Sequence, residues 1–507
     1  MIDKKTESAP QRPRKRWRKT KWFYGIVLTY VAVTITAGVW WSAYSHRKFR
    51  EAVDPIIARG EPLAWSDFAT DPIPDDQNAA ILYKQAMDDP VLTDLKWMLE
   101  REFGDIMETL ECDSYDLIHE FTAKREVRQK HPDEVQELLG MAKDAFVLCR
   151  KARLRDKVDW GGDFSGKAYE DAGPRGLVSC VSIANLLFLA AVEAHDAGRD
   201  DDAVEYIRDM IALGDSLIAY PRMINHMICL AVNDIAIQAF EEILPSLEIG
   251  DAPGSASIKN IRRLLARLLD DVPLRQGLTL VLMGERSANY EACLRVLNLD
   301  LPDGEVDVEF GGDYYSSSIF AKAGYDYCMA PLLRVDAAWS VKRCDAYVRA
   351  SSSQTLPEYR RAIRQTVLDA EEYFERPSYV RQLSSILYYM FGQSFRGHYR
   401  YLAKRQMAGV ALAVRMYQID CGRLPDRLGQ LVSDYLANIP QDPMAESGSQ
   451  IRYVNDPKDP RLYCLGLDGL DDGGAYDADE DEYYHKDTLF FLSNRPDVRE
   501  KDSDQDE

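Results

Sequence analysis

The sequence has few of the residues from which catalytic centres are usually assembled. It holds only seven histidines in 507 residues, and none belongs to an HExxH pair. It also has no GxSxG nucleophile turn. These absences exclude the common signatures of zinc peptidases and serine hydrolases. A triad that is assembled only in three dimensions leaves no such pattern, so an extracytoplasmic enzyme stays open as an alternative.

Cysteine is scarce and dispersed. The nine cysteines lie at 112, 149, 180, 229, 293, 328, 344, 421 and 464, without the close spacing of a zinc site or of a small disulfide scaffold. We expect most of them to be small buried apolar side chains.

A phosphate-binding loop is also incomplete. Residues 161–167 have the glycine and lysine spacing of such a loop, but Ala168 stands where a Ser or Thr should bind magnesium. No hydrophobic strand precedes the segment. We therefore interpret it as a solvated loop.

Charge is distributed unevenly along the chain. The formal net charge is −21, yet residues 1–50 hold twelve Lys or Arg against Asp3 and Glu7, a local net charge of +10. The remaining 457 residues therefore carry about −31. Such an acidic body repels phosphate backbones at long range, which argues against nucleic-acid binding.

An uncharged run follows the basic residues 1–21. No side chain is charged from Trp22 to Tyr44, and a helix of that length spans about 35 Å, enough for a hydrocarbon core of about 30 Å. Both ends of the run carry aromatic residues, which favour the headgroup level: Trp22, Phe23, Tyr24, Trp40, Trp41 and Tyr44. We predict a transmembrane helix over 22–44 that contacts the lipid bilayer.

The flanking charges predict the orientation of this helix. Nine positive charges precede the run, and only Arg47, Lys48 and Arg50 follow it closely. This asymmetry predicts a single-pass protein with a basic cytoplasmic arm at 1–21 and a periplasmic or extracytoplasmic body. A cleavable signal peptide is the alternative, but the run is long for one, and the bulky Trp40 and Trp41 crowd the cleavage region. We favour an uncleaved signal-anchor.

Two further segments precede the C-terminal part. Residues 45–77 are rich in proline and acidic residues, and Pro62, Pro72 and Pro74 argue against a continuous helix, so we expect an extended spacer. Residues 78–400 show helical periodicity and predict a helical domain. We expect helices at 177–194, 200–218, 223–244, 256–297, 318–350, 357–375 and 378–421, with breaks at 250–254 and 302–313. The last of these helices continues beyond residue 400 into the C-terminal part.

The clearest helices form a pair. Apolar residues recur at three-to-four spacing over 200–218, after the acidic Asp200 and Asp201. The preceding segment 177–194 is apolar nearly all round but carries Asn185 and Glu193, which favours a buried central helix over a second membrane span. Gly198 predicts a tight turn between the two. No pattern recurs at 34 residues, so we expect an irregular antiparallel bundle and not a repeat solenoid.

The pattern changes after Gly422. Prolines separate short apolar runs at 451–454, 462–465 and 489–492, which predict strands of a small sheet. The expected fold is therefore mainly α. It comprises the transmembrane helix, the helical bundle, a C-terminal α+β domain at 401–493 with a short antiparallel sheet, and a disordered acidic tail at 494–507.

One acidic loop is the only candidate metal site. Over 467–482 carboxylates alternate with glycines, and glycine lets a backbone curl so that several oxygens can surround Ca²⁺. The candidate ligands are Asp468, Asp472, Asp477 and Asp479. Leu470 and Asp479 occupy the third and twelfth positions, where a helix-loop-helix calcium loop has a polar ligand and a glutamate, so that form is rejected. A solvated acidic turn remains the alternative.

Residues 406–492 resemble the C-terminal part of the major pseudopilins of type II secretion. The resemblance comprises the end of a long helix, a G-R-x-P turn, an "iP.DP" segment and a glycine-rich "LGxDG" loop. The matching residues are Gly422, Arg423, Pro425, Tyr435, Leu436, Pro440, Asp442, Pro443, Leu465, Gly466, Asp468, Gly469, Gly473 and Gly474.

This resemblance implies calcium ligation by Asp468 and by a later aspartate, which an acidic insertion leaves open among Asp477, Asp479 and Asp487. It covers about 90 residues, and about 360 residues separate it from the apolar run, whereas pseudopilins join the two directly. The segment 25–30 also lacks the glutamate that follows the cleavage glycine in that family. The whole chain is similar to membrane-anchored proteins of planctomycete-type bacteria, which share the Arg-Gly-Glu-Pro segment at 59–62; this likeness implies no activity.

These observations favour an interaction or scaffold protein of the cell envelope over an enzyme. Protein partners are expected, and calcium is the one cofactor implied. A component associated with type II secretion or pilus-like machinery is the second hypothesis.

Overall fold

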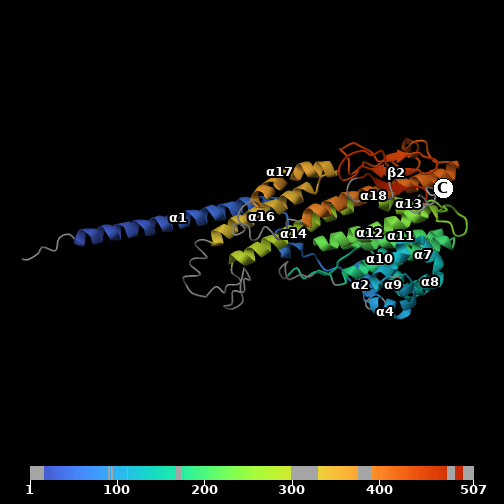
Figure 1. The fold of residues 1–507 in the computed structure, drawn as a ribbon, viewed down its shortest axis with the longest axis horizontal. Coiled ribbons are helices and arrows are strands. Elements are labelled where there is room, and N and C mark those ends of the chain that lie inside the picture. Colours follow the sequence, from blue (N-terminus) through green and yellow to red (C-terminus); the bar gives the residue numbers. More distant parts are fainter. Residues whose placement is uncertain are drawn as a thin grey trace, which may run out of the picture.

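The computed structural model describes residues 16–89, 92, 95–110, 112–165, 173–174, 176–298, 329–374, 390–476 and 486–494. The fold is mainly helical, with a short three-stranded antiparallel sheet near the C-terminus, so the predicted fold class is confirmed. The long helix α1 projects from one end of an elongated body (Figure 1).

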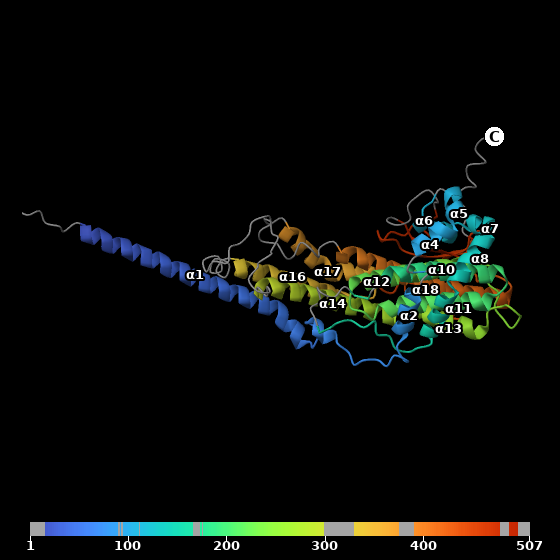
Figure 2. The ribbon, with the colours of Figure 1, turned by 90° about the horizontal axis from the view of Figure 1, so that it is seen from below.

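Helix α1, Arg16–Ala58, has two parts with different surroundings. Its apolar side chains from Trp22 to Trp40 are largely exposed, and this part stands clear of the body (Figure 2). Its last turns pack on α16 through Ala52, Val53 and Ile56. The predicted extended spacer at 45–77 is therefore helical up to Ala58, because these residues form an apolar stripe that α16 covers.

The remainder of the spacer follows the side of the body. It contains a single 3-10 turn, η1, at Trp65–Phe68. The Trp65 ring is fully buried against Phe68 and Phe164. The backbone N–H of Trp65 donates to Glu291 of α14 at 2.7 Å.

The part of the body next to α1 consists of α14 (Val272–Asn298), α16 (Ala330–Ala350) and α17 (Leu356–Phe374). The single helix predicted over 256–297 is two helices, α13 (Ile258–Leu269) and α14. Asp270 leaves the helical conformation between them, and Pro273 suits the first turn of the helix that follows. Of the predicted 318–350 helix, residues 318–328 lie outside the described residues.

The far part of the body is a bundle around α10 (Leu177–Asp196), α11 (Asp200–Leu217), α12 (Met223–Ile243) and α18 (Met390–Cys421). The predicted pair α10 and α11 is present, and Gly198 between them has a φ of 70°, as a tight turn requires. Shorter helices cover this bundle: α2 (Ala79–Met87), α4 (Leu95–Glu102), α5 (Gly104–Leu110), α6 (Ser114–Ala123), α7 (Arg125–Lys130), α8 (Pro132–Met141) and α9 (Lys143–Arg153).

The sheet has the order β1 (Arg452–Val454), β2 (Arg461–Cys464) and β3 (Thr488–Phe491). Both pairs are antiparallel, with Tyr453 opposite Leu462 and Leu462 opposite Phe490. Each strand begins one residue earlier or later than predicted. A short 3-10 helix, η4 (Leu428–Leu431), links α18 to the sheet.

The boundary predicted at residues 400 and 401 falls inside α18. This helix is continuous from Met390 to Cys421, and its buried residues Leu402, Met407 and Val414 belong to the same core as α10 to α13. Leu462 and Phe490 of the sheet join that core too. The C-terminal part is thus packed as one unit with the helical body.

Among the residues that the structure describes, three helices are long and apolar enough to cross a membrane. Only 6% of the most apolar window is buried in the helix that starts at Lys21, against 67% in α10 and 56% in α12. The first helix therefore presents its apolar surface outward, whereas the other two use most of theirs in the core.

Candidate functional site

The acidic loop lies in the connection between β2 and β3, and its described residues up to 476 fold tightly against the residues that precede β3. A Cβ atom on Gly466 would lie 2.3 Å from the carbonyl oxygen of Lys486, and one on Gly474 would lie 2.8 Å from the Tyr463 ring. Gly474 also has a φ of 68°. These two positions require glycine, as expected for a loop that curls to gather oxygens.

Asp487 is the carboxylate that the folded loop surrounds. Its Oδ2 atom accepts hydrogen bonds from the backbone N–H groups of Asp472 (3.0 Å) and Gly474 (2.9 Å). Its Oδ1 atom is buried and has no hydrogen-bond partner among the described residues. An oxygen of this kind, buried and unpaired, is a candidate cation ligand.

Burial raises the pKa of Asp487, and the negative charges of Asp471 and Asp472 raise it further, whereas the Gly474 N–H lowers it. The net direction is upward. A cation bound beside these carboxylates would remove the mutual repulsion that causes part of this rise.

The predicted ligands occupy different places. Asp468 is exposed, and its Oδ1 accepts from the N–H of Leu470 at 3.0 Å. Asp472 contributes its backbone N–H to Asp487, while Asp477 and Asp479 lie outside the described residues. Within the described ranges no group of three or more His, Cys, Asp or Glu is arranged to hold a metal ion. Asp487 therefore fits calcium as one ligand, and a complete set would need further oxygens.

Asp442 holds the base of this loop in place. It is fully buried, and its Oδ2 accepts from Arg452 Nη1 (2.7 Å) and from the N–H of Leu465 (3.0 Å). Its Oδ1 accepts from the N–H of Met444 at 2.8 Å. The aspartate of the "DP" segment thus links that segment to the end of β2, which is a structural role.

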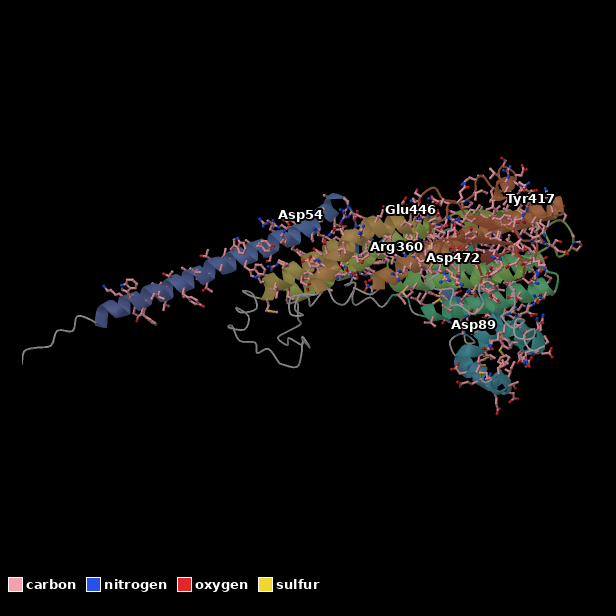
Figure 3. All side chains as sticks on the ribbon, turned by 45° about the horizontal axis from the view of Figure 1, so that its top comes forward. Asp54, Asp89, Arg360, Tyr417, Glu446 and Asp472 are labelled. Atoms are coloured by element: carbon pink, nitrogen blue, oxygen red, sulfur yellow. The ribbon has the colours of Figure 1, made fainter. Side chains whose placement is uncertain are left out.

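Helix α17 also reaches the loop. Arg360 Nη2 donates to the carbonyl oxygen of Leu467 at 2.6 Å, and Arg360 and Asp472 lie on the same side of the body (Figure 3). Burial lowers the pKa of Arg360, and the negative charge of Asp468 opposes that change. The loop is therefore attached to the helical body as well as to the sheet.

A second polar cluster, which sequence reasoning did not detect, joins α1 to the body. We name Arg59, Glu61, Arg286 and Asp345 the clamp. The fully buried Arg286 donates through Nη1 to Glu61 Oε2 (2.6 Å) and Asp345 Oδ1 (2.8 Å), and through Nη2 to the carbonyl oxygen of Pro62 (2.8 Å). Arg59 bridges the same two carboxylates. Both arginines thus face the same two carboxylates just beyond the end of α1.

A third cluster lies in the far bundle. Arg405 of α18 is almost fully buried and pairs with Asp215 of α11 at 3.1 Å, and Arg267 of α13 pairs with the same carboxylate at 2.5 Å. Asn233 of α12 donates to Asp215 at 3.1 Å. This cluster ties four helices of the bundle together.

Two histidines also meet inside the body. The ring centroids of His226 (α12) and His398 (α18) are 5.2 Å apart. Both nitrogens of His226 are buried and have no hydrogen-bond partner among the described residues. Burial lowers the pKa of His226 to about 4, so both the surroundings and the lack of partners favour the neutral imidazole.

No family model matches this sequence, and no match was found among the curated proteins or the solved structures. Function therefore has to be inferred from the residues of the chain itself.

Proposed function

We propose that this chain is a single-pass, membrane-anchored protein of the cell envelope that acts as an interaction or scaffold protein. Its N-terminus lies in the cytoplasm and its acidic body on the other side. The observation that carries the proposal is the division of α1 into an exposed apolar part and a part fixed to the body.

The exposed part has the properties of a span. Its side chains from Trp22 to Trp40 are apolar and largely without protein contacts, a surface that is costly in water and suited to lipid. The positive charges before residue 22 outnumber those just after residue 44, which supports the cytoplasmic placement of the N-terminus.

The fixed part supports a scaffold role. The clamp and the apolar contacts of Ala52, Val53 and Ile56 prevent free rotation of the body about its anchor. A body held in this way would present its far surfaces at a set distance from the bilayer. Recognition of partners there requires no catalytic chemistry.

Cys421 provides a direct test of orientation. Among the described cysteines it alone is exposed. A membrane-impermeant maleimide applied to intact spheroplasts should modify the Cys421 peptide, with Cys421→Ser as the matched control. Modification only after lysis would contradict an exported body.

The scaffold role is tested by the size of the assembly. After crosslinking in cells and mild solubilisation, the full chain should migrate as a complex larger than the chain in its micelle. In a second form, residues 22–44 are replaced by a cleavable signal, so that the exported body carries no membrane segment. A complex that this form still makes contains partners of the body and not lipid bound to the span. Recovery of both forms as bare chains would argue against the proposal.

Calcium is proposed as a stabilising ion of the β2–β3 loop, supported by the buried, unpaired Oδ1 of Asp487. The resemblance to pseudopilins supports a second candidate, a component associated with type II secretion or pilus-like machinery. The arrangement that favours it is a long helix followed by a small sheet with an acidic β2–β3 loop. Loss of secretion in a deletion strain, restored by the full chain, would support this second candidate over a general scaffold.

A further inference from the structure

The turn between α10 and α11 holds a histidine between a carboxylate and a hydroxyl. His195 Nδ1 lies 2.5 Å from Asp200 Oδ1, and His195 Nε2 lies 2.8 Å from Ser246 Oγ. A serine within hydrogen-bond reach of a base, with an acid that orients the base from its other nitrogen, is the arrangement that activates a serine as a nucleophile. We name Ser246, His195 and Asp200 the serine relay.

Asp200 is buried and is held in place by the backbone. Its Oδ2 atom accepts from the N–H of Glu248 at 2.8 Å, and its own N–H donates to the carbonyl oxygen of Gly254 at 2.7 Å. A carboxylate can only accept hydrogen bonds, so Nδ1 of His195 carries the proton in this pair. Nε2 is then left to accept the hydroxyl proton of Ser246, as a general base must.

Three helix ends bring the relay together. His195 lies in the last turn of α10, Asp200 in the first turn of α11, and Ser246 in the connection that follows α12. A Cβ atom on Gly254 would lie 2.2 Å from the carbonyl oxygen of Gly198, so only glycine lets this connection approach the turn so closely. The connection lies at the end of the body opposite α1, as the light-green loop of Figure 1 shows.

The serine side of the relay faces solvent. Ser246 is exposed, and the side chain of His195 is 12% exposed, whereas that of Asp200 is 6% exposed. The nucleophile is thus at the surface and the orienting acid is inside, so a group on another molecule can reach Ser246 without any movement of the fold.

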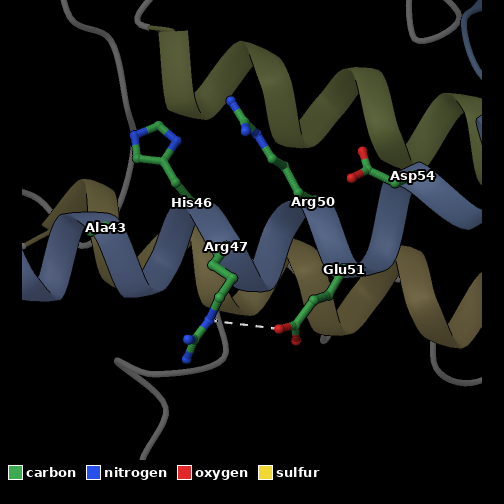
Figure 4. A pocket seen from close by; sticks show the side chains of 6 residues that line it. All are labelled: Ala43, His46, Arg47, Arg50, Glu51 and Asp54. Carbon is green, nitrogen blue, oxygen red and sulfur yellow. Dashed lines mark ion pairs between the residues drawn. The ribbon is translucent and has the colours of Figure 1, made fainter.

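Other histidines have different surroundings. His46 lines a hollow of about 410 Å³ beside α1, and the described residues around it include bases and acids but no Ser, Thr or Cys (Figure 4). Neither nitrogen of His226 has a hydrogen-bond partner among the described residues. A hydroxyl and an orienting acid therefore distinguish His195 from these two histidines.

Helix α18 places a cation beside the same connection. Arg415 Nε donates at 3.0 Å to the carbonyl oxygen of Leu247, the residue after Ser246. Its Nη1 donates to Gln418 at 2.8 Å, and its Nη2 has no hydrogen-bond partner within the described ranges. A positive charge here would stabilise the negative oxygen that forms when a serine attacks a carbonyl group.

We propose that the serine relay hydrolyses an acyl ester carried on another molecule. Ser246 Oγ attacks the carbonyl carbon and passes its proton to His195 Nε2, which protonates the alcohol oxygen as the ester C–O bond breaks. Water then attacks the acyl-serine, gives a proton to the same nitrogen and releases the acyl group as a carboxylic acid, while that proton returns to Ser246. Ester and water thus become acid and alcohol. This activity is additional to the scaffold role and does not depend on the anchor.

The first test is covalent labelling of the full-length chain in detergent with a fluorophosphonate probe, followed by peptide mass spectrometry. Ser246 should be labelled, and His195→Gln should slow its labelling by about a hundredfold, because the serine then lacks its base. Ser352→Ala is the matched control, since Ser352 is also exposed just after a helix but donates to the carbonyl oxygen of Arg349. It should leave the labelling of Ser246 unchanged.

The second test is hydrolysis of p-nitrophenyl acetate by the same preparations. Ser246→Ala should lower kcat/KM by about a hundredfold or more without changing the melting temperature, because this side chain is exposed. Asp200→Asn should also lower it strongly, since an amide can hold the imidazole in the wrong tautomer. Arg415→Met should lower kcat by about a hundredfold, more than it changes KM.

A third measurement requires no ester. The thiol of Ser246→Cys should react with iodoacetamide faster than the exposed Cys421, and addition of His195→Gln should remove the difference. Equal reaction rates of the two thiols, equal labelling of Ser246 in the wild type and in His195→Gln, or equal ester hydrolysis by the wild type and Ser246→Ala would each overturn the proposal. The three residues would then be a structural link between the ends of α10, α11 and α12.

Discussion

Residues 22–44 and 45–58 of α1 belong to one helix, yet they meet different surroundings. The first part is apolar on all sides, and Leu28 and Trp40 are 69% and 66% exposed. The second part is apolar on one side, and Ile56 is 0% exposed against α16. Apolar side chains on every side of a helix thus suit lipid, whereas an apolar stripe on one side suits packing against another helix.

The body shows a parallel contrast. The end next to α1 is joined to that helix by a small apolar cluster and the charges of the clamp, whereas the far end is held together by a large apolar core that contains buried ion pairs such as Arg405 with Asp215. We therefore expect substitutions at the far end to lower global stability and substitutions in the clamp to act locally.

The largest effect is expected for Arg405→Met in the far bundle. It would leave Asp215 buried, with only the more exposed Arg267 as a charged partner, at a cost of about 4 kcal/mol. Urea unfolding of the full chain in detergent measures this loss. The double variant Asp215→Asn with Arg405→Met removes both charges and should recover part of it; equal losses in both variants would show that lost packing, and not the unpaired charge, dominates.

Arg286→Met should weaken the clamp by about 3 kcal/mol, because Glu61 would keep only the partly exposed Arg59 as a charged partner, and Asp345 only Arg59 and the exposed Arg349. Hydrogen exchange should accelerate in residues 45–62 and remain unchanged in α11 and α12. Uniform acceleration over the whole body would contradict the separation of the two regions. Arg349→Met is the control, since that exposed side chain pairs with Asp345 from the surface.

Acid should destabilise the far bundle through His226. The folded pKa is about 4, below the unfolded value near 6.5, so the unfolded chain binds protons first as the pH falls. The stabilising contribution is complete above about pH 6.5 and is lost towards pH 4, to a total of about 3 kcal/mol. His226→Phe keeps a ring of similar size without titration, so the wild type should lose more stability than this variant over that range. Parallel pH profiles would refute the assignment.

Calcium should stabilise the full chain by about 2.7 kcal/mol at a hundredfold excess over its dissociation constant. Asp487→Asn should abolish the shift in melting temperature, because it changes the buried carboxylate that the loop surrounds. Asp468→Ala tests the residue favoured by the resemblance. An equal calcium shift in the wild type and in Asp487→Asn would show that Asp487 does not bind the ion, and the loop would then be a solvated acidic turn.

The smallest effect is expected for Arg361→Gln. Its pair with Glu446 is more than half exposed on both sides, so its loss should cost less than about 1 kcal/mol. A larger loss in urea unfolding would show that α17 and the C-terminal part depend on surface pairs more than the buried contacts imply.

Local pattern predicted much of the fold. The pair α10 and α11 and the three strands were found from periodicity and from Gly198, within one to two residues. Pro273 is a sequence signal for the break at Asp270. The helical periodicity on both sides of the break nevertheless predicted one continuous helix. The helical stretch of α1 beyond residue 44 was missed because an apolar stripe of three residues is weak without its partner α16.

The sites were less predictable. Arg286 and Asp345 lie 225 and 284 residues after Glu61, so no local pattern joins them. Sequence left Asp477, Asp479 and Asp487 equivalent. Of these three, only Asp487 lies among the described residues, where its carboxylate is buried.

Hydrogen exchange of the full chain in nanodiscs would show whether α1 runs unbroken from the bilayer into the body. If α1 is one helix that passes from the bilayer into the clamp, amides from residue 22 to 58 should be protected without interruption, by lipid in the first part and by α16 in the second. Rapid exchange between residues 42 and 50 would reveal a hinge, and rapid exchange throughout 22–44 would show that the segment is not in the membrane. Either result would contradict a body held firmly on a membrane anchor.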